Sequence, residues 1–225
     1  GYSWHHKTIE GFSFTHMSGV GWYGDLGNFL VMPTTGTLKT FKGTEEEPDS
    51  GYRSRYSHER EQASAHKYTV MLDDYQIQAE LAAAPRSGII RFTYPKSDTS
   101  RIQIDLARRI GGSSTEQYVE VVDNHTIKGW MKCTPNTGGW GDGQGKADYT
   151  VYFHCCFDKP LKNFGVWSAD IPDEADRKNA SNDNPAYFEY IKNAKVLPMQ
   201  KSTQGKHLGF YTEFPTEEGE QVLLK

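Results

Sequence analysis

The residues best suited to chemistry lie in one glycine-rich segment, residues 11–33. Five glycines fall within 17 residues there, and glycine allows positive φ angles and a close approach of the backbone to a ligand. The polar and aromatic residues between and beside them are His16, Ser18, Trp22, Tyr23, Asp25 and Asn28. A tryptophan among short polar groups suits a sugar, because the C–H face of the sugar stacks on indole while its hydroxyls bond to Asp, Asn or His. The residues alone equally allow a glycine-kinked β-loop with a buried His and Trp.

Two other kinds of site are disfavoured in this part of the chain. Gly19, Gly21 and Gly24 have the spacing of a dinucleotide-binding loop, but that motif needs a helix directly after it and residues 29–33 favour a strand. His5 and His6, together with His16, could bind a metal. Adjacent histidines on a strand point to opposite faces, however, so one metal site could not easily use both.

A second, charge-rich segment covers residues 53–61 and contains Arg55, His58 and Glu59. Such a segment is typical of a solvated ladder of ion pairs, and the alternative is a clamp lining a ligand cleft. Asp73 and Asp74 are interpreted as a turn. No carboxylate pair stands in apolar surroundings that would raise its pKa, so the residues alone indicate no catalytic centre.

The elements that position these segments are predicted to be strands. Residues 67–72 and 76–81 alternate apolar and polar on both sides of an Asp-rich turn, which predicts a hairpin. Further strands are expected at residues 88–94, 101–106, 118–122, 126–133, 149–157, 163–167, 207–214 and 221–224. One short helical turn is expected over residues 185–191, and residues 40–50 and 168–184 are expected to be polar surface loops. Short strands at fairly even spacing predict an all-β sandwich or barrel.

Composition excludes several classes of protein. The chain has 225 residues, 13% aromatic residues and a net charge of −4. The aromatic content argues against disorder, and the absence of a basic block argues against a nucleic-acid partner. No run approaches the roughly 18 apolar residues that span a membrane. Cys133, Cys155 and Cys156 lack the spacing of a zinc site and are expected to be buried free thiols.

The glycine-rich segment resembles a family signature. Residues 11–21 and 24–33 are similar to GFSHTHLSGTG…GD(L/I)LLMP of family 92 glycoside hydrolases. Residues 52–59 are similar to the R-(F/Y)-S-H-E segment of the same family. The resemblance continues through residues 73–75, 79–83, 86, 88, 91–95, 127–130 and 151–153, and so covers nearly the whole chain.

The resemblance implies an N-terminal antiparallel β-sandwich, a galactose-mutarotase-like supersandwich, followed by an (α/α)6 barrel. Residues 1–225 are then expected to form one β-sandwich domain, as a piece of a longer chain, since both ends look cut. It also implies a calcium-dependent, inverting exo-α-mannosidase acting on α-mannosides of glycans, with the α-1,2 linkage expected. The catalytic carboxylates and the Ca²⁺ ligands would belong to the helical domain, and none is assigned in this chain.

By the same resemblance, the loops of the sandwich close over the mannose. We expect Trp22 to stack on the sugar, with His16, Asp25, Ser18 and Gly19 around it, and Arg55, His58 and Glu59 in a second tier. The expected partners are mannose-containing glycans and the chain's own C-terminal helical domain, in a periplasmic or secreted protein. This chain departs from the signature at Phe14, Met17 and Val20, where the family has His, Leu and Thr; the first change bears on linkage preference.

Two other functions fit the same residues. One is a stand-alone carbohydrate-binding β-sandwich without catalysis, which would bind mannose through Trp22. The other is a purely structural domain that docks onto a helical partner through an exposed apolar face.

Overall fold

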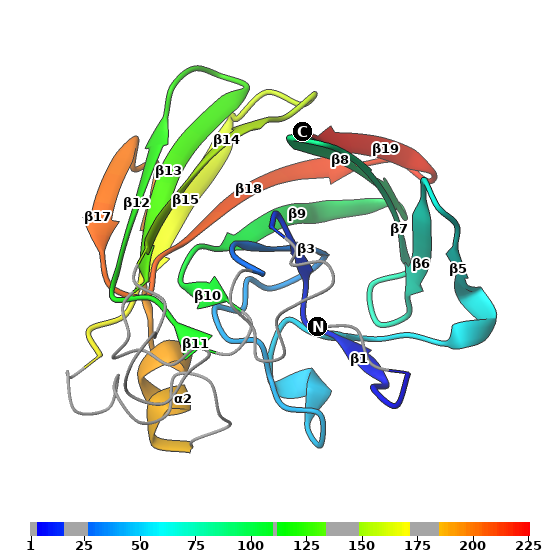
Figure 1. The fold of residues 1–225 in the computed structure, drawn as a ribbon, viewed down its shortest axis with the longest axis horizontal. Helices are drawn as coiled ribbons and strands as arrows, with labels where there is room; N and C mark the ends of the chain where they lie inside the picture. Colours follow the sequence, from blue (N-terminus) through cyan, green and yellow to red (C-terminus); the bar gives the residue numbers. More distant parts are fainter. Residues whose placement is uncertain (1–3, 16–26, 110–111, 134–148, 172–184) are drawn as a thin grey trace.

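The computed structural model describes residues 4–15, 27–109, 112–133, 149–171 and 185–225, and these form a two-layered β-sandwich (Figure 1). One layer is a six-stranded sheet in the order β16-β15-β18-β9-β3-β2. Its strands are β16 (Lys195–Pro198), β15 (Asn163–Ser168), β18 (Gly209–Thr216), β9 (Ser97–Asp105), β3 (Leu30–Thr34) and β2 (Phe12–Ser13). All their pairings are antiparallel, as expected from the sequence.

The other layer consists of two sheets joined at their edges. The four-stranded sheet contains β14 (Tyr149–Cys156), β13 (Thr126–Cys133), β12 (Glu116–Val121) and β17 (Ser202–Gly205), in that order. The five-stranded sheet contains β19 (Glu220–Leu224), β8 (Ser87–Tyr94), β7 (Ile77–Ala84), β6 (Tyr68–Leu72) and β5 (Glu61–Ala63). Cys156 and Lys225 exchange two backbone hydrogen bonds of 2.7 and 2.8 Å, so β14 and β19 connect the sheets. Figure 1 shows this layer arching from β17 to β5.

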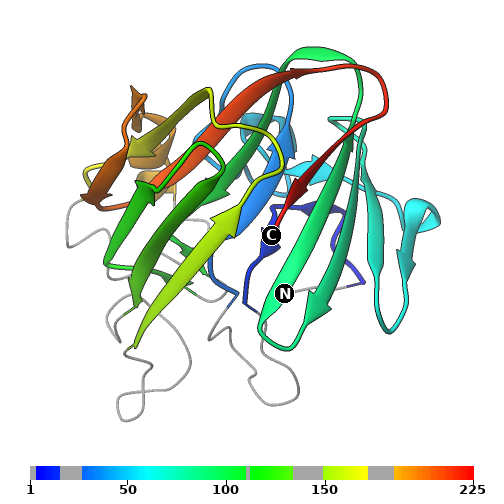
Figure 2. The same ribbon diagram turned by 90° about the horizontal axis from the view of Figure 1, so that it is seen from above.

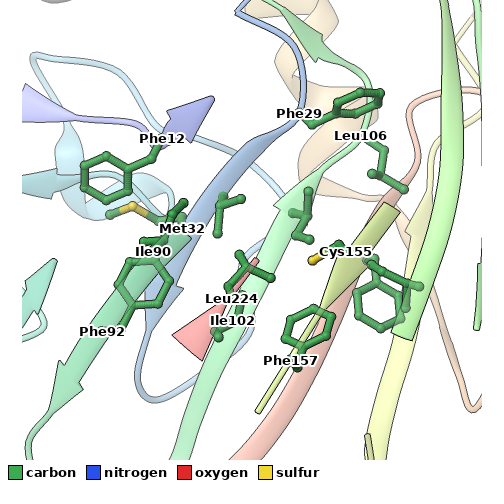
Figure 3. Close-up of a cluster of buried hydrophobic side chains, with 14 of the residues drawn as sticks. Phe12, Phe29, Met32, Ile90, Phe92, Ile102, Leu106, Cys155, Phe157 and Leu224 are labelled. Atoms are coloured by element: carbon green, nitrogen blue, oxygen red, sulfur yellow. The ribbon is translucent and has the colours of Figure 1, made fainter. Parts of the chain in front are cut away.

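The hydrophobic core fills the space between the layers, and both contribute to it (Figure 3). Alternate residues point inward, as the sequence pattern predicted: Ile102 and Ile104 on β9 are fully buried, as are Ile127 and Met131 on β13. Burial of such side chains contributes about 1.5–3 kcal/mol each. Cys133 and Cys155 are buried free thiols as expected, whereas Cys156 is only partly buried.

Smaller elements lie at one end of the sandwich. Two-residue strands pair as β1 (Thr8–Ile9) with β4 (Ser54–Arg55) and β10 (Arg108–Arg109) with β11 (Gly112–Ser113). Single 3₁₀ turns cover Pro48–Ser50 and His58–Arg60. The α-helix α2 (Pro185–Lys192) confirms the expected helical turn, and no helix in the described part of the chain is long and apolar enough to cross a bilayer.

Helix α2 belongs to a second, smaller core. Phe41, Ala169, Ile171, Phe188 and Ile191 are buried together there. The expectation that residues 40–50 and 168–184 are surface loops is therefore wrong for Phe41, Ala169 and Ile171. Their apolar side chains are covered because α2 folds back onto them, a long-range contact that a local polarity pattern does not reveal.

Candidate functional site

Asn28 holds the two ends of the glycine-rich segment together. Its side-chain Oδ1 accepts a hydrogen bond from Thr15 Oγ1 at 2.8 Å, and its backbone N–H donates to the same hydroxyl at 2.9 Å. Its carbonyl accepts from the Phe14 N–H at 3.0 Å. Residues 16–26 are thus bracketed by a buried polar clasp that continues the β2–β3 pairing.

The same asparagine reaches the four-stranded sheet. Its Nδ2 lies 3.2 Å from both the Tyr149 hydroxyl and Met131 Sδ, and 3.8 Å from Cys133 Sγ. Cys133 ends β13 and Tyr149 begins β14, so the stems of residues 16–26 and of residues 134–148 meet at Asn28. This junction brings Asn28, the end of β13 and the start of β14 together.

The backbone around Asn28 is specialised. Gly27 has φ 69° and Phe29 has φ 61°, so one left-handed residue stands on each side of Asn28. Positive φ is uncommon for a bulky residue and persists only where packing holds it. The Phe29 ring supplies that packing, with centroids 4.7 Å from Phe153 and 6.0 Å from Phe14. Phe14, which replaces the signature histidine, therefore serves as an apolar support for Phe29.

The expected sugar-binding residues themselves lie outside the described residues. These are His16, Ser18, Gly19, Trp22 and Asp25. Their contact with a sugar stays a prediction, while the structure establishes the contacts of Thr15 and Asn28, on either side of them in the chain.

A partly buried ionic cluster lies next to Asn28, since the Phe29 N–H donates to the Arg108 carbonyl at 3.1 Å. Asp105, at the end of β9, accepts from the Tyr52 hydroxyl at 2.9 Å and from the Arg108 N–H at 3.0 Å. The Arg108 guanidinium lies 3.3 Å from Glu10. The cluster thus joins β9 and β10 to Glu10, which directly follows β1, and to Tyr52, which lies just before β4.

The electrostatics of this cluster suit positioning rather than proton transfer. Burial alone would raise the pKa of Glu10, but Arg108, Lys42 and Arg53 hold it far below its usual range. Burial, reinforced by the Asp105 charge, raises the pKa of Tyr52 well above 10. Neither group is poised to exchange a proton near neutral pH, whereas catalytic acids and bases have a pKa near the working pH.

Arg55, His58 and Glu59 lie at a different corner, around β4 and the 3₁₀ turn that follows it. Arg55 forms ion pairs with Asp49 and Asp74 at 2.8 and 2.7 Å, and Glu59 is exposed. In the described part of the chain, no hydrogen bond or ion pair joins these three residues to Thr15 or Asn28. The observed bonds favour the ion-pair interpretation of this segment for Arg55.

His58 forms a compact cluster of its own. Its ring stacks on Trp4 with centroids 3.8 Å apart, and its Nδ1 lies 2.6 Å from Glu61 Oε2. Its Nε2 lies 2.9 Å from the Trp4 carbonyl. Hydrogen bonds to Glu61 and then to Trp4 raise the pKa of His58. Because both partners are acceptors, the imidazolium form satisfies both ring nitrogens.

Sequence reasoning did not identify Glu10, Tyr52, Asp105 and Arg108 as a group. Tyr52 opens the second segment of the family resemblance, which was the one local signal available. The described residues also contain no group of three or more His, Cys, Asp or Glu side chains arranged to bind a metal ion.

Comparison with known proteins identifies the family to which this two-layered sandwich belongs. The model of the glycosyl hydrolase family 92 N-terminal domain matches residues 1–225, so the chain belongs to that family. No curated protein sequence is significantly similar to the chain.

Solved structures agree with this identification. The chain is similar to the family 92 α-mannosidase BT3965 of Bacteroides thetaiotaomicron, determined in complex with mannoimidazole, with 34% identity over the whole chain and a TM-score of 0.79. The family 92 glycosyl hydrolase ccman5 (24% identity over 100% of this chain and 26% of that one, TM-score 0.66) shares the fold. So does the inverting mannosidase BT2199 of Bacteroides thetaiotaomicron (18% identity over 87% and 21%, TM-score 0.58). The chain spans 26% of the length of BT3965.

Proposed function

We propose that this chain is the N-terminal domain of a calcium-dependent, inverting exo-α-mannosidase that hydrolyses α-1,2-linked mannosides of glycans. The observation that carries the proposal is family membership over residues 1–225 together with 34% identity to an α-mannosidase. In this proposal the catalytic carboxylates and the Ca²⁺ ligands belong to an (α/α)6 domain elsewhere in a longer chain, and the protein is exported to the periplasm or beyond.

The sandwich contributes the glycine-rich segment to the mannose site. Trp22 stacks on the sugar ring, and His16, Asp25, Ser18 and Gly19 bond to its hydroxyls or shape the loop. The Asn28 clasp supports this role, since it fixes both stems of residues 16–26 on the rigid sandwich. A binding loop held at a buried base retains its geometry, which is what orientation of a substrate requires.

The reaction is a single displacement at the anomeric carbon. One carboxylic acid protonates the leaving oxygen while a carboxylate activates water on the opposite face, with the two groups about 6.5–9.5 Å apart. When bound, calcium supplies an oxygen-preferring cation that holds the mannose hydroxyls. The part supplied by this chain is substrate binding and the exclusion of water by its loops.

The test of the site is Trp22→Ala in the full-length protein. Loss of a stacked aromatic contact, worth about 1.4 kcal/mol or more, should lower kcat/KM for α-1,2-mannobiose at least about tenfold. Tyr190→Ala, at an exposed position on α2, is the matched control and should leave kcat/KM unchanged. Equal kcat/KM in the Trp22→Ala variant and the parent protein would contradict the stacking role.

The test of the division of labour uses the two parts separately. Residues 1–225 alone should hydrolyse no α-mannoside, while the full-length protein should be active, inhibited by a chelator and restored by Ca²⁺. Hydrolysis by the 225-residue chain would overturn the placement of the carboxylates in the helical domain.

The clasp itself is tested by Thr15→Val, which removes only the hydroxyl shared with Asn28. It leaves buried polar groups of Asn28 without a partner, which costs about 1–3 kcal/mol. We expect a lower kcat/KM for mannobiose because the loop stem loosens. Thr126→Val, at a buried threonine on β13, serves as the control and should leave kcat/KM unchanged.

A further inference from the structure

Three aromatic side chains form a straight row across the four-stranded sheet. Tyr118 on β12 pairs directly with Trp130 on β13, and Trp130 pairs directly with Tyr152 on β14. Directly paired residues project from the same face of a sheet. Their chain neighbours Val119 and Met131 are buried in the core, so the row lies on the outer face. Figures 1 and 2 show these three strands side by side at the outside of the described fold.

The members of this aromatic row (Tyr118, Trp130 and Tyr152) differ in exposure: the first two are half-buried and the third is exposed. Tyr118 and Trp130 contact one another, with centroids 6.0 Å apart and planes 20° apart, as cross-strand aromatic pairs commonly do. Tyr152 is different, because it is 72% exposed and has neither a ring contact nor a hydrogen bond with any described residue. An exposed tyrosine beside a tryptophan and a second tyrosine leaves apolar surface available to a ligand.

Two polar rows flank the aromatic row. On one side Glu116, Lys132 and Thr150 are paired across the strands, and on the other side Glu120, Lys128 and His154. Glu120 accepts a hydrogen bond from the Tyr118 hydroxyl at 2.9 Å and lies 3.3 Å from Lys128. Two carboxylates balance two ammonium groups, so the face is close to neutral.

These features select the chemistry of the occupant. A balanced face offers no excess positive charge to a polyanion such as a nucleic acid. An apolar protein surface would have to desolvate two carboxylates and two ammonium groups on either side of the row, which is costly. A pyranose chain fits, since each ring has an apolar C–H face and a rim of hydroxyls that bond to Glu, Lys, Thr and His. The row crosses three strands and is about 10 Å long, which suits a short oligosaccharide.

We propose that the outer face of β12, β13 and β14 is a surface that binds neutral glycan chains, with the aromatic row as its platform. Asn28, at the base of the glycine-rich segment, contacts Met131 and Cys133 on the opposite face of β13 from Trp130. The proposal goes beyond the mannosidase function, and holding a polymer at this face would keep chain ends close to the enzyme.

The experiment measures retention of the full-length protein in native gels that contain soluble α-mannan, a neutral polymer of pyranoses. The parent protein should be retarded by the polymer. Tyr152→Ala should weaken the retardation at least fivefold, since this exposed side chain can be removed without disturbing the core, and Trp130→Ala should abolish it. Tyr190→Ala, which removes an exposed ring from α2, should be retarded like the parent protein.

A second pair of variants separates this surface from the mannose site. Trp22→Ala should remain retarded, because the aromatic row is intact. Loss of retardation in Trp22→Ala with retention in Tyr152→Ala would overturn the proposal, as would a parent protein that migrates freely in the polymer. A dimer that dissociates on Tyr152→Ala substitution would also overturn it, since a second copy would then occupy the face. Failure of the mannosidase function shows separately, as absence of mannobiose hydrolysis with retardation unchanged.

Discussion

Arg101 and Arg55 both form ion pairs with carboxylates, but in very different surroundings. Arg101, on β9, donates to the Gly36 carbonyl at 2.8 Å and to Thr34 Oγ1 at 3.2 Å, and it forms an ion pair with Glu213. Arg55, on β4, bonds to Asp49 and Asp74. The Arg101 side chain is 2% exposed, whereas that of Arg55 is 45% exposed.

The difference in exposure decides what each arginine contributes. In the interior, a charge left without its partner retains the full cost of desolvation, so the pair is indispensable once it is buried. At the surface, water and salt replace a lost partner at little cost. Arg101 thus binds residues 34–36 to the outer face of the six-stranded sheet. Arg55 lies at the surface, where the backbone pairing of β1 and β4 already holds the chain in place.

The largest effect is expected from Glu213→Gln. The substitution leaves the buried Arg101 charge uncompensated; the cost of breaking a fully buried pair is about 3 kcal/mol, which is an upper bound here because the Glu213 side chain is 25% exposed. In urea unfolding monitored by tryptophan fluorescence, the variant should unfold at a lower midpoint urea concentration than the parent protein.

The double variant Arg101→Met/Glu213→Leu is the companion measurement. Removing both charges relieves the uncompensated desolvation, so the double variant should be more stable than Glu213→Gln. A double variant that loses the sum of two large single effects would show that the charges themselves, and not their pairing, stabilise the sheet.

The strands of the fold could be predicted from the sequence, whereas the contacts between distant segments could not. The hairpin of β6 and β7 and the whole of β13 follow from local alternation and turn residues, and the structure confirms them. On β9 the same alternation predicted a strand correctly. The alternation does not predict which residues cover the polar face of β9, where Gln103 donates to the Lys39 carbonyl 64 residues away.

The candidate site divides in the same way. Glycine content and the family signature made residues 11–33 visible in the sequence. The partners of Asn28 could not be predicted in the same way, because Met131, Cys133 and Tyr149 lie more than 100 residues later in the chain. The edge-to-edge joint between β14 and β19 is equally long-range, so sequence could predict a sandwich but not its sheet order.

An intermediate, pH-dependent effect is expected at His58, which belongs to the exposed corner. Its folded-state pKa is raised by the bonds to Glu61 and Trp4, so its contribution to stability is complete below its ordinary pKa of about 6.5. That contribution is lost as the pH rises through the folded-state pKa. The stability difference between the parent protein and His58→Gln should therefore shrink between pH 5.5 and pH 8.5.

The control for that measurement is His66→Gln, since His66 is an exposed histidine in the turn between β5 and β6. Its loss of stability is the reference for replacing an exposed histidine by glutamine. A stability difference for His58→Gln that grows with pH would mean that the neutral ring, not the imidazolium, holds Trp4.

The smallest effect is expected from Arg55→Ala. Both aspartates it would leave, Asp49 and Asp74, remain accessible to water, and the β1–β4 backbone pairing is retained. The loss of stability should fall well below that of Glu213→Gln and should decrease further in 1 M NaCl, where the screening length is about 3 Å. The loss from Glu213→Gln should persist at the same salt concentration because Arg101 is shielded from ions. An Arg55→Ala loss as large as that of Glu213→Gln, and equally resistant to salt, would show that exposure does not distinguish the two networks.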